Sequence, residues 1–343
     1  MLKRSSTAAA LAAVLLFGLP AALAAQEEGY PFRWSNFRIE LSGGWLGVSP
    51  ESLNRIVDYE NTYLGHYYIK QYAYYDELYG DAYTARFAYA GDQEFRSLNR
   101  IAPLSVALRY QASPTFGLSL GVQYIKGVQS SGVGLDVQVE DSRPEAALPG
   151  ASTIHYDNDD LTVSVESWMP FLQANFGWDF FKILRGEIFI MGGPILGDLK
   201  VWNERFESVT TDAGTVASGS WTMEMTGRST SIAIETGAQL RARILPFVEI
   251  YGQAGYAFQQ LNQISGLDTI RTATELPAVT ESSWAVKGTW GVTWEKATTP
   301  WGGFSAPTLT TSYSPMGRQP VGTTVASVDL SGLQLAAGLS IRL

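Results

Sequence analysis

The residues best suited to acid–base or metal chemistry are few and lie in two segments. The chain has two histidines and no cysteine. His155 shortly precedes the acidic run 157–160, and His66 lies in a tyrosine-rich stretch. Acid–base catalysis needs partners held at fixed positions, and an EF-hand calcium loop needs a glycine and a terminal glutamate that this run lacks. We therefore predict no catalytic residues, no metal site and no cofactor, and we do not expect an enzyme.

A second set of charged residues occupies alternate positions within apolar segments. Alternate residues of a strand face the same side, so charges from several strands of one closed sheet would meet inside it. Their near balance favours internal ion pairs, and a narrow ion-conducting path is the alternative. The set comprises Arg38, Glu40, Arg109, Glu235, Arg241, Glu249 and Arg342, with Arg185 and Glu187 as a further pair.

The elements that must position these charges are segments with an apolar residue at every second position, which is the pattern of a strand with one apolar face. The clearest is the last, in which Leu335, Leu339, Ile341 and Leu343 share a face. In the fourth segment, Pro170 removes a hydrogen-bond donor, so we expect a bulge there. The eight segments are 37–45, 102–110, 116–124, 161–176, 184–196, 232–242, 248–258 and 333–343.

The links between these segments are alternately short and long, as in an up-and-down transmembrane β-barrel. We therefore predict an all-β, antiparallel barrel in which 333–343 pairs with the strand near Phe37. We favour eight strands. Ten is the alternative, because 284–294 is also amphipathic and could pair with 304–313, or could instead form an extracellular hairpin. The links expected to be long extracellular loops are 49–100, 127–160, 200–229 and 260–326.

The N-terminus predicts export. Lys3 and Arg4 precede a short apolar stretch and a run of small residues, as in a secretory signal peptide. We expect residues 1–24 to be the signal, cleavage after Ala24 or Ala25, a lead over 25–35 and the barrel over 36–343. The formal net charge is −9, and there is no basic cluster, which argues against nucleic acid as a partner.

These features together resemble the small bacterial outer-membrane barrels, which include the OmpA transmembrane domain and the OmpX, opacity-like and OmpW groups. The resemblance implies an outer-membrane location, contact with outer-membrane lipid, and reading of the last strand by the barrel-assembly machinery. In this chain Leu343 stands where the family usually has a terminal aromatic residue. The ten-stranded omptin proteases, which use His and Asp at the extracellular rim, make a rim hydrolase a minor hypothesis.

Ten tyrosines lie between positions 59 and 89. Tyrosine suits recognition surfaces because it gives a large amphipathic contact area. The segment is therefore expected either to bind an extracellular partner or to fold over the barrel mouth. The function we favour is a structural or surface-interaction barrel with a filled lumen, and the alternative is a narrow channel or carrier for small or apolar solutes.

Overall fold

The structure is a computed structural model that describes residues 36–146, 150–276, 278–311 and 324–343. The expected signal peptide, its cleavage site at Ala24 or Ala25 and the lead over 25–35 lie outside these residues. The described chain is nearly all antiparallel β-sheet, as predicted. Its strands are β1 (Phe37–Gly47), β2 (Tyr83–Gly91), β3 (Arg100–Gln111), β4 (Phe116–Asp141), β5 (Gly150–Phe181), β6 (Leu184–Thr211), β7 (Gly214–Leu245), β8 (Val248–Asn262), β9 (Ser265–Leu276), β10 (Thr280–Thr299), β11 (Gly302–Thr311), β12 (Thr324–Val325), β13 (Ser327–Asp329) and β14 (Gly332–Arg342).

Eight of the described strands form a closed circuit of antiparallel pairings, which we call the ring. Its order is β1-β3-β4-β5-β6-β7-β8-β14, and β14 pairs back onto β1. In that last pairing Leu41 lies opposite Leu339 and Arg38 lies opposite Arg342. Every ring strand therefore has a hydrogen-bonded neighbour on both sides, so the ring leaves no open edge.

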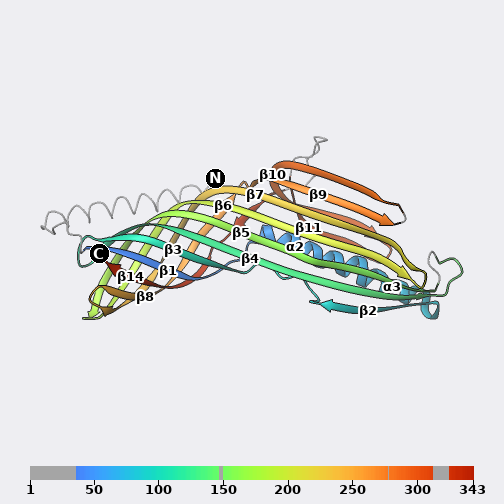
Figure 1. The fold of residues 1–343 in the computed structure, drawn as a ribbon, viewed down its shortest axis with the longest axis horizontal. Helices are drawn as coiled ribbons and strands as arrows, with labels where there is room; N and C mark the ends of the chain where they lie inside the picture. The colour runs from blue at the N-terminus through green and yellow to red at the C-terminus, as the bar shows by residue number, and fades with distance from the viewer. Residues whose placement is uncertain (1–35, 147–149, 277, 312–323) are drawn as a thin grey trace.

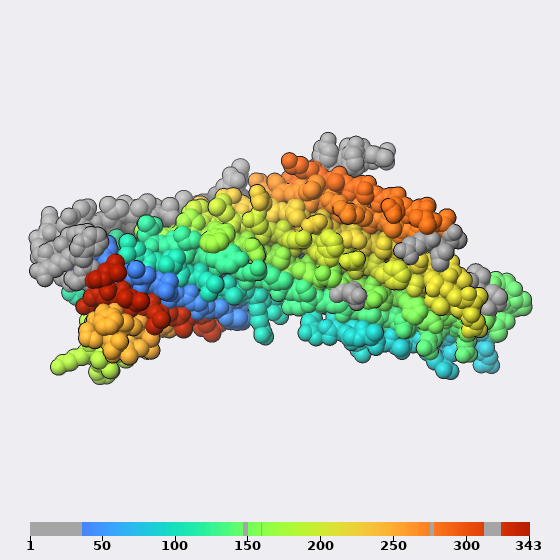
Figure 2. All heavy atoms as spheres, viewed as in Figure 1, coloured from blue at the N-terminus to red at the C-terminus, as the bar shows by residue number. Residues whose placement is uncertain are grey.

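Four ring strands continue far past the ring, and we call this further part of the same sheet the extension. It contains residues 127–141 of β4, 150–165 of β5, 199–211 of β6 and 214–227 of β7, together with β2 and β9 to β11. Strands β8 and β9 run in the same direction along β7, with a break at Gln263, whose φ is 54°. Figure 1 shows the long strands bowing away from the ring, and Figure 2 shows the elongated body that results.

A helical segment follows the extension between its two edges, β11 and β2 (Figure 1). It consists of α2 (Glu51–Tyr63), a π-helical stretch (η2, Leu64–Lys70), α3 (Gln71–Tyr79) and a final 3₁₀ turn (η3, Gly80–Ala82). Positions 53, 56, 57, 60, 64 and 68 are all buried, which is the spacing of one helix face. That face packs on the concave side of the extension, where α2 contacts β5 and β11 and α3 contacts β2.

The segments predicted as long loops are mostly regular secondary structure, which corrects that expectation. Segment 49–100 carries the helices and β2, segments 127–160 and 200–229 continue β4 to β7, and segment 260–326 contains β9 to β11. The amphipathic strand at 284–294 is part of β10, which pairs with β9 and β11 and not with a ring strand.

The bulge expected at Pro170 is absent, so that prediction was wrong. Pro170 pairs with Val122 in the uninterrupted part of the β4–β5 register. On its β6 side the pairing is interrupted after Trp168 and Leu196, and it resumes in the same register at Leu172 and Gly192. Gly193 approaches this strand closely, because a Cβ there would lie 1.9 Å from the Pro170 carbonyl oxygen.

Candidate functional site

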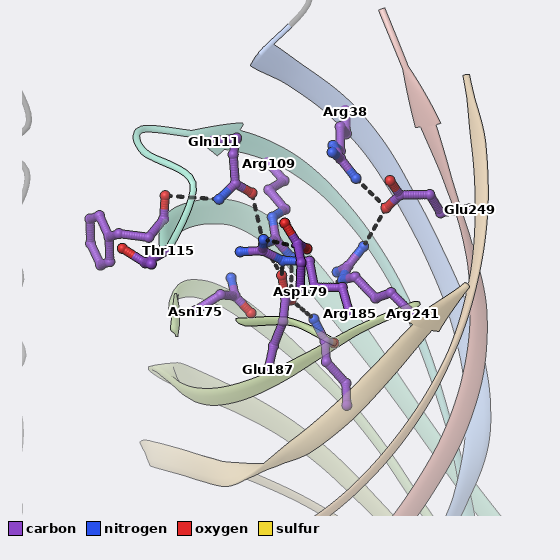
Figure 3. Close-up of polar contacts among 12 residues, drawn as sticks. Arg38, Arg109, Gln111, Thr115, Asn175, Asp179, Arg185, Glu187, Arg241 and Glu249 are labelled. Atoms are coloured by element: carbon purple, nitrogen blue, oxygen red, sulfur yellow. Dashed lines mark hydrogen bonds and ion pairs between the residues drawn. The ribbon is translucent and has the colours of Figure 1, made fainter. Parts of the chain in front are cut away.

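The interior of the ring holds a cluster of ion pairs centred on Glu187 (Figure 3). Arg109 donates two hydrogen bonds to Glu187, of 2.7 and 2.6 Å, and the Nε atoms of Arg185 and Arg241 donate at 2.6 and 2.9 Å. Arg241 also donates to Glu40 at 2.5 Å. The Glu187 carboxylate thus joins guanidinium groups from three strands across the ring, an arrangement in which bidentate arginine pairs are strong.

The structure brings together five of the seven charged residues predicted to face the interior. Arg38 is paired with Glu249, whose carboxylate also lies 3.8 Å from Arg241. Arg241 thereby links the Arg38–Glu249 pair to Glu187, and Arg109 also reaches Glu40 at 3.6 Å. Arg185 and Glu187, which the sequence analysis gave as a further pair, lie at the centre of the cluster.

The remaining two predicted residues lie apart from these ion pairs. Glu235 is fully buried in the ring interior, where its neighbours are the amide side chains of Gln123 and Gln334. Arg342 lines the mouth of the ring close to Arg38. Neither forms an ion pair with another of the described residues, so Glu235 and Arg342 extend the polar interior without adding to the cluster.

An apolar layer lies beyond the cluster, at the end of the ring nearest the extension. Its members lie on the inward faces of β1, β4, β5, β6 and β8. Each is fully buried, and they are Leu46, Ile125, Met169, Ile195 and Leu261. This layer is continuous with the core beneath the helical segment, so side chains fill the interior from the ion pairs to the extension.

The outer face of the ring is apolar and ends at a row of charges. Exposed apolar side chains occur on every ring strand, for example Leu104 at 55% and Leu120 at 67% exposure. The row begins at Lys126, which pairs with Glu166, and continues to Asp198, which pairs with Arg228. Immediately on the ring side, Tyr124 and Trp168 pack with ring centroids 4.6 Å apart. The outer surface therefore changes from apolar to charged where the extension begins, with aromatic residues at the border.

A buried polar group fastens the helical segment to the extension. Glu60 of α2 is fully buried and accepts a hydrogen bond of 2.8 Å from Asn203, and its carboxylate lies 3.8 Å from Arg205. Burial raises the pKa of Glu60 because the loss of solvation outweighs the attraction of Arg205. Sequence analysis missed this group, although the helical spacing of 53, 56, 57, 60 and 64 was a signal that could have found it.

A pocket of about 580 Å³ lies between the helical segment and the extension. Arg205 forms part of its wall, with its guanidinium 4.4 Å from the ring centre of Tyr63 and 5.0 Å from that of Trp221. Glu207 lies beside it, 3.1 Å from the Arg205 Nε. Burial raises the pKa of Tyr63 and of Tyr72 to about 12, so both keep their hydroxyl protons at neutral pH. The pocket thus combines aromatic faces with hydroxyl, carboxylate and guanidinium groups.

The tyrosine-rich segment is therefore largely folded against the extension. Tyr68 and Tyr83 are buried, whereas Tyr79 and Tyr89 are exposed at 36% and 37%. The tyrosines that line the pocket are Tyr63, Tyr67, Tyr68 and Tyr72. One face of this segment is packed on the extension and another borders the pocket, and the expected extracellular partner stays a prediction.

The two histidines lie in different environments. His66 is buried among Tyr67, Trp301 and Phe304, and its Nε2 lies 3.1 Å from the Thr299 hydroxyl. His155 lies on β5, with Nδ1 2.7 Å from Asp136 on β4. Among the described residues, no cluster of His, Cys, Asp and Glu could hold a metal ion.

No known family model matches the chain, and no curated protein matches it significantly. Within the described residues, no helix has both the length and the apolar character needed to cross a membrane.

Proposed function

We propose that the ring is an eight-stranded transmembrane β-barrel of the bacterial outer membrane, and that the extension is an extracellular binding module. The observation that carries this proposal is that the same strands have an apolar outer face and an interior face whose charged side chains form ion pairs. A bilayer has no water to pair with backbone groups, so a sheet can span it only if it has no open edge. Strands β1 and β14 have 11 residues each, close to the 9–11 residues that a spanning strand needs.

The outer-membrane lipid and the assembly machinery are the partners that this proposal implies. Leu335, Leu339, Ile341 and Leu343 are exposed on the outer face of β14 or at its end, where they would contact lipid. We propose that the barrel-assembly machinery reads this strand, since it closes the ring against β1.

The filled interior favours a structural or surface-interaction protein over a channel or carrier. Eight-stranded barrels are just wide enough for side chains to fill, and here the fill consists of the Glu187 cluster and the apolar layer. The pocket between the helical segment and the extension is the place where we propose that an extracellular partner binds. Its mixture of aromatic and polar groups suits an amphipathic, uncharged ligand.

The proposed orientation can be tested with single cysteines, because the chain has none of its own. Asp212→Cys places a thiol at the β6–β7 turn, at the far end of the extension, and Lys182→Cys places one at the β5–β6 turn, at the opposite end of the ring. In intact cells, a membrane-impermeant maleimide is expected to label the first variant and not the second. Both should react after lysis, and equal labelling of Lys182→Cys in intact cells would contradict the orientation.

The filled lumen predicts an absence of ion conduction. Purified protein reconstituted in a planar bilayer is expected to give no steady current steps, because the fully buried side chains of the apolar layer occupy the interior. A porin inserted under the same conditions provides the positive control. Reproducible ion-selective steps from the pure protein would overturn the filled-lumen proposal and favour the narrow channel.

A further inference from the structure

The mouth of the ring, at the end that carries the short turns 112–115, 182–183 and 246–247, contains a second cavity. It has a volume of about 660 Å³ and lies between the ion-pair cluster and the turns at this end of the ring. Lys182, at its rim, is exposed. The arginines in its lining are Arg38, Arg185, Arg241, Arg243 and Arg342.

The side-chain charges around this mouth do not balance. The arginines of the lining, the carboxylates paired with them, and Arg109, which shares two of those carboxylates, form one charged set. Four carboxylates face six guanidinium groups, an excess of two positive charges before Lys182 is counted. Within the described residues, the carboxylates are Glu40, Asp179, Glu187 and Glu249, and the guanidiniums are those of the lining together with Arg109.

Several buried donors at the mouth have no hydrogen-bond acceptor among the described residues. They are Nε of Arg38, Nη2 of Arg185 and Nη1 of Arg241. Arg241 is 1% exposed, and its Nη1 lies 3.8 Å from a carboxylate oxygen of Glu249. A buried charged donor without an acceptor is costly. Guanidinium groups also present paired donors whose geometry matches that of a carboxylate or a phosphate.

We infer that this mouth is a binding site for a small anionic group, namely a phosphate or a carboxylate. The excess charge attracts the anion, and the unpaired guanidinium donors supply hydrogen bonds that the chain itself does not complete. The site does not depend on the pocket in the extension. Under the proposed orientation it opens to the periplasm, where the anion could be free phosphate or a carboxylate carried by the cell wall.

The experiment measures phosphate binding to the full chain in neutral detergent by calorimetry, at an ionic strength held constant with chloride. Saturable binding of one phosphate per chain is expected. The double variant Arg243→Gln/Arg342→Gln removes the excess charge and should weaken binding by about tenfold or more. The matched control is Arg228→Gln, an exposed arginine of β7 outside the mouth, which should bind as the unmodified chain does.

Two outcomes would overturn the site: no saturation by about 10 mM phosphate, or equal affinity in the double variant and the unmodified chain. If the double variant does not fold, Arg342→Gln alone replaces it, because Arg342 belongs to the lining but to no ion pair among the described residues. A parallel titration with a soluble muropeptide separates the sources. Tighter muropeptide binding would assign the site to cell-wall carboxylates, and tighter phosphate binding would assign it to the free ion.

Discussion

Replacing Glu187 with alanine is expected to lower the free energy of unfolding by at least about 3–5 kcal/mol, the usual cost of removing one partner from a buried ion pair. The cost is high because Arg109 and Arg241, each 1% exposed, would both lose a buried carboxylate acceptor. Arg185 would lose its bond of 2.6 Å as well. The measurement is urea unfolding in detergent micelles, followed by tryptophan fluorescence.

The matched control for this variant is Glu166→Ala, which removes a carboxylate from the exposed pair with Lys126. An exposed pair contributes about 1 kcal/mol or less, so the unfolding midpoint should barely move. If Glu187→Ala fails to fold, the double-mutant cycle of Glu187→Gln with Arg109→Gln measures the coupling directly. Equal losses in the Glu187 and Glu166 variants would show that the cluster does not stabilise the ring.

Replacing Trp290 with alanine is expected to cost about 3–5 kcal/mol, because it removes a large side chain from a packed core. Trp290 is fully buried on β10, and it packs closely over two glycines. A Cβ added to Gly227 would lie 2.8 Å from the Trp290 ring, and one added to Gly266 would lie 2.6 Å from its Nε1. The glycines and the tryptophan therefore form one fitted contact between β7, β9 and β10.

Trp284→Ala provides the control in the same strand, since Trp284 is 47% exposed and its loss should cost much less. Amide hydrogen exchange should localise the effect of Trp290→Ala. Protection is expected to fall in β9 to β11 and to persist in β1, β3, β8 and β14, which belong to the ring alone. A uniform loss of protection would mean that ring and extension unfold as a single unit.

The pairing that closes the ring was predictable from the sequence because its strands have one apolar and one polar face. In 333–343 the alternation is unbroken, and the structure pairs this segment with β1 as expected. The same alternation of faces predicts the interior positions of Arg38, Glu40, Arg109, Arg241 and Glu249. The central role of Glu187 was harder to see, because its strand contains Gly192, Gly193 and Pro194, which blur the alternation.

The extension was not predicted, although its strands carry a comparable signal. Val133, Leu135, Val137 and Val139 alternate with polar residues and are buried, but they fell within a segment expected to be a loop. Alternation of apolar and polar residues identifies a strand that has one apolar face. It does not show whether that face contacts lipid, the lumen or a helix. The helical segment escaped detection because tyrosines occupy much of its apolar face and hide the helical spacing of Leu53, Ile56, Val57 and Leu64.

The uninterrupted run of β5 and β7 has a mechanical consequence. Each has 32 residues and belongs to both the ring and the extension, which corresponds to a length of about 100 Å at the usual rise per residue. In the membrane topology that we propose, about 30 Å of that length would lie inside the hydrocarbon core, and the rest would extend beyond the membrane as a stiff sheet. A partner held in the tyrosine-lined pocket would then lie at a fixed height and angle above the membrane. A force applied to that partner would be transmitted along these strands to the backbone hydrogen bonds of the ring.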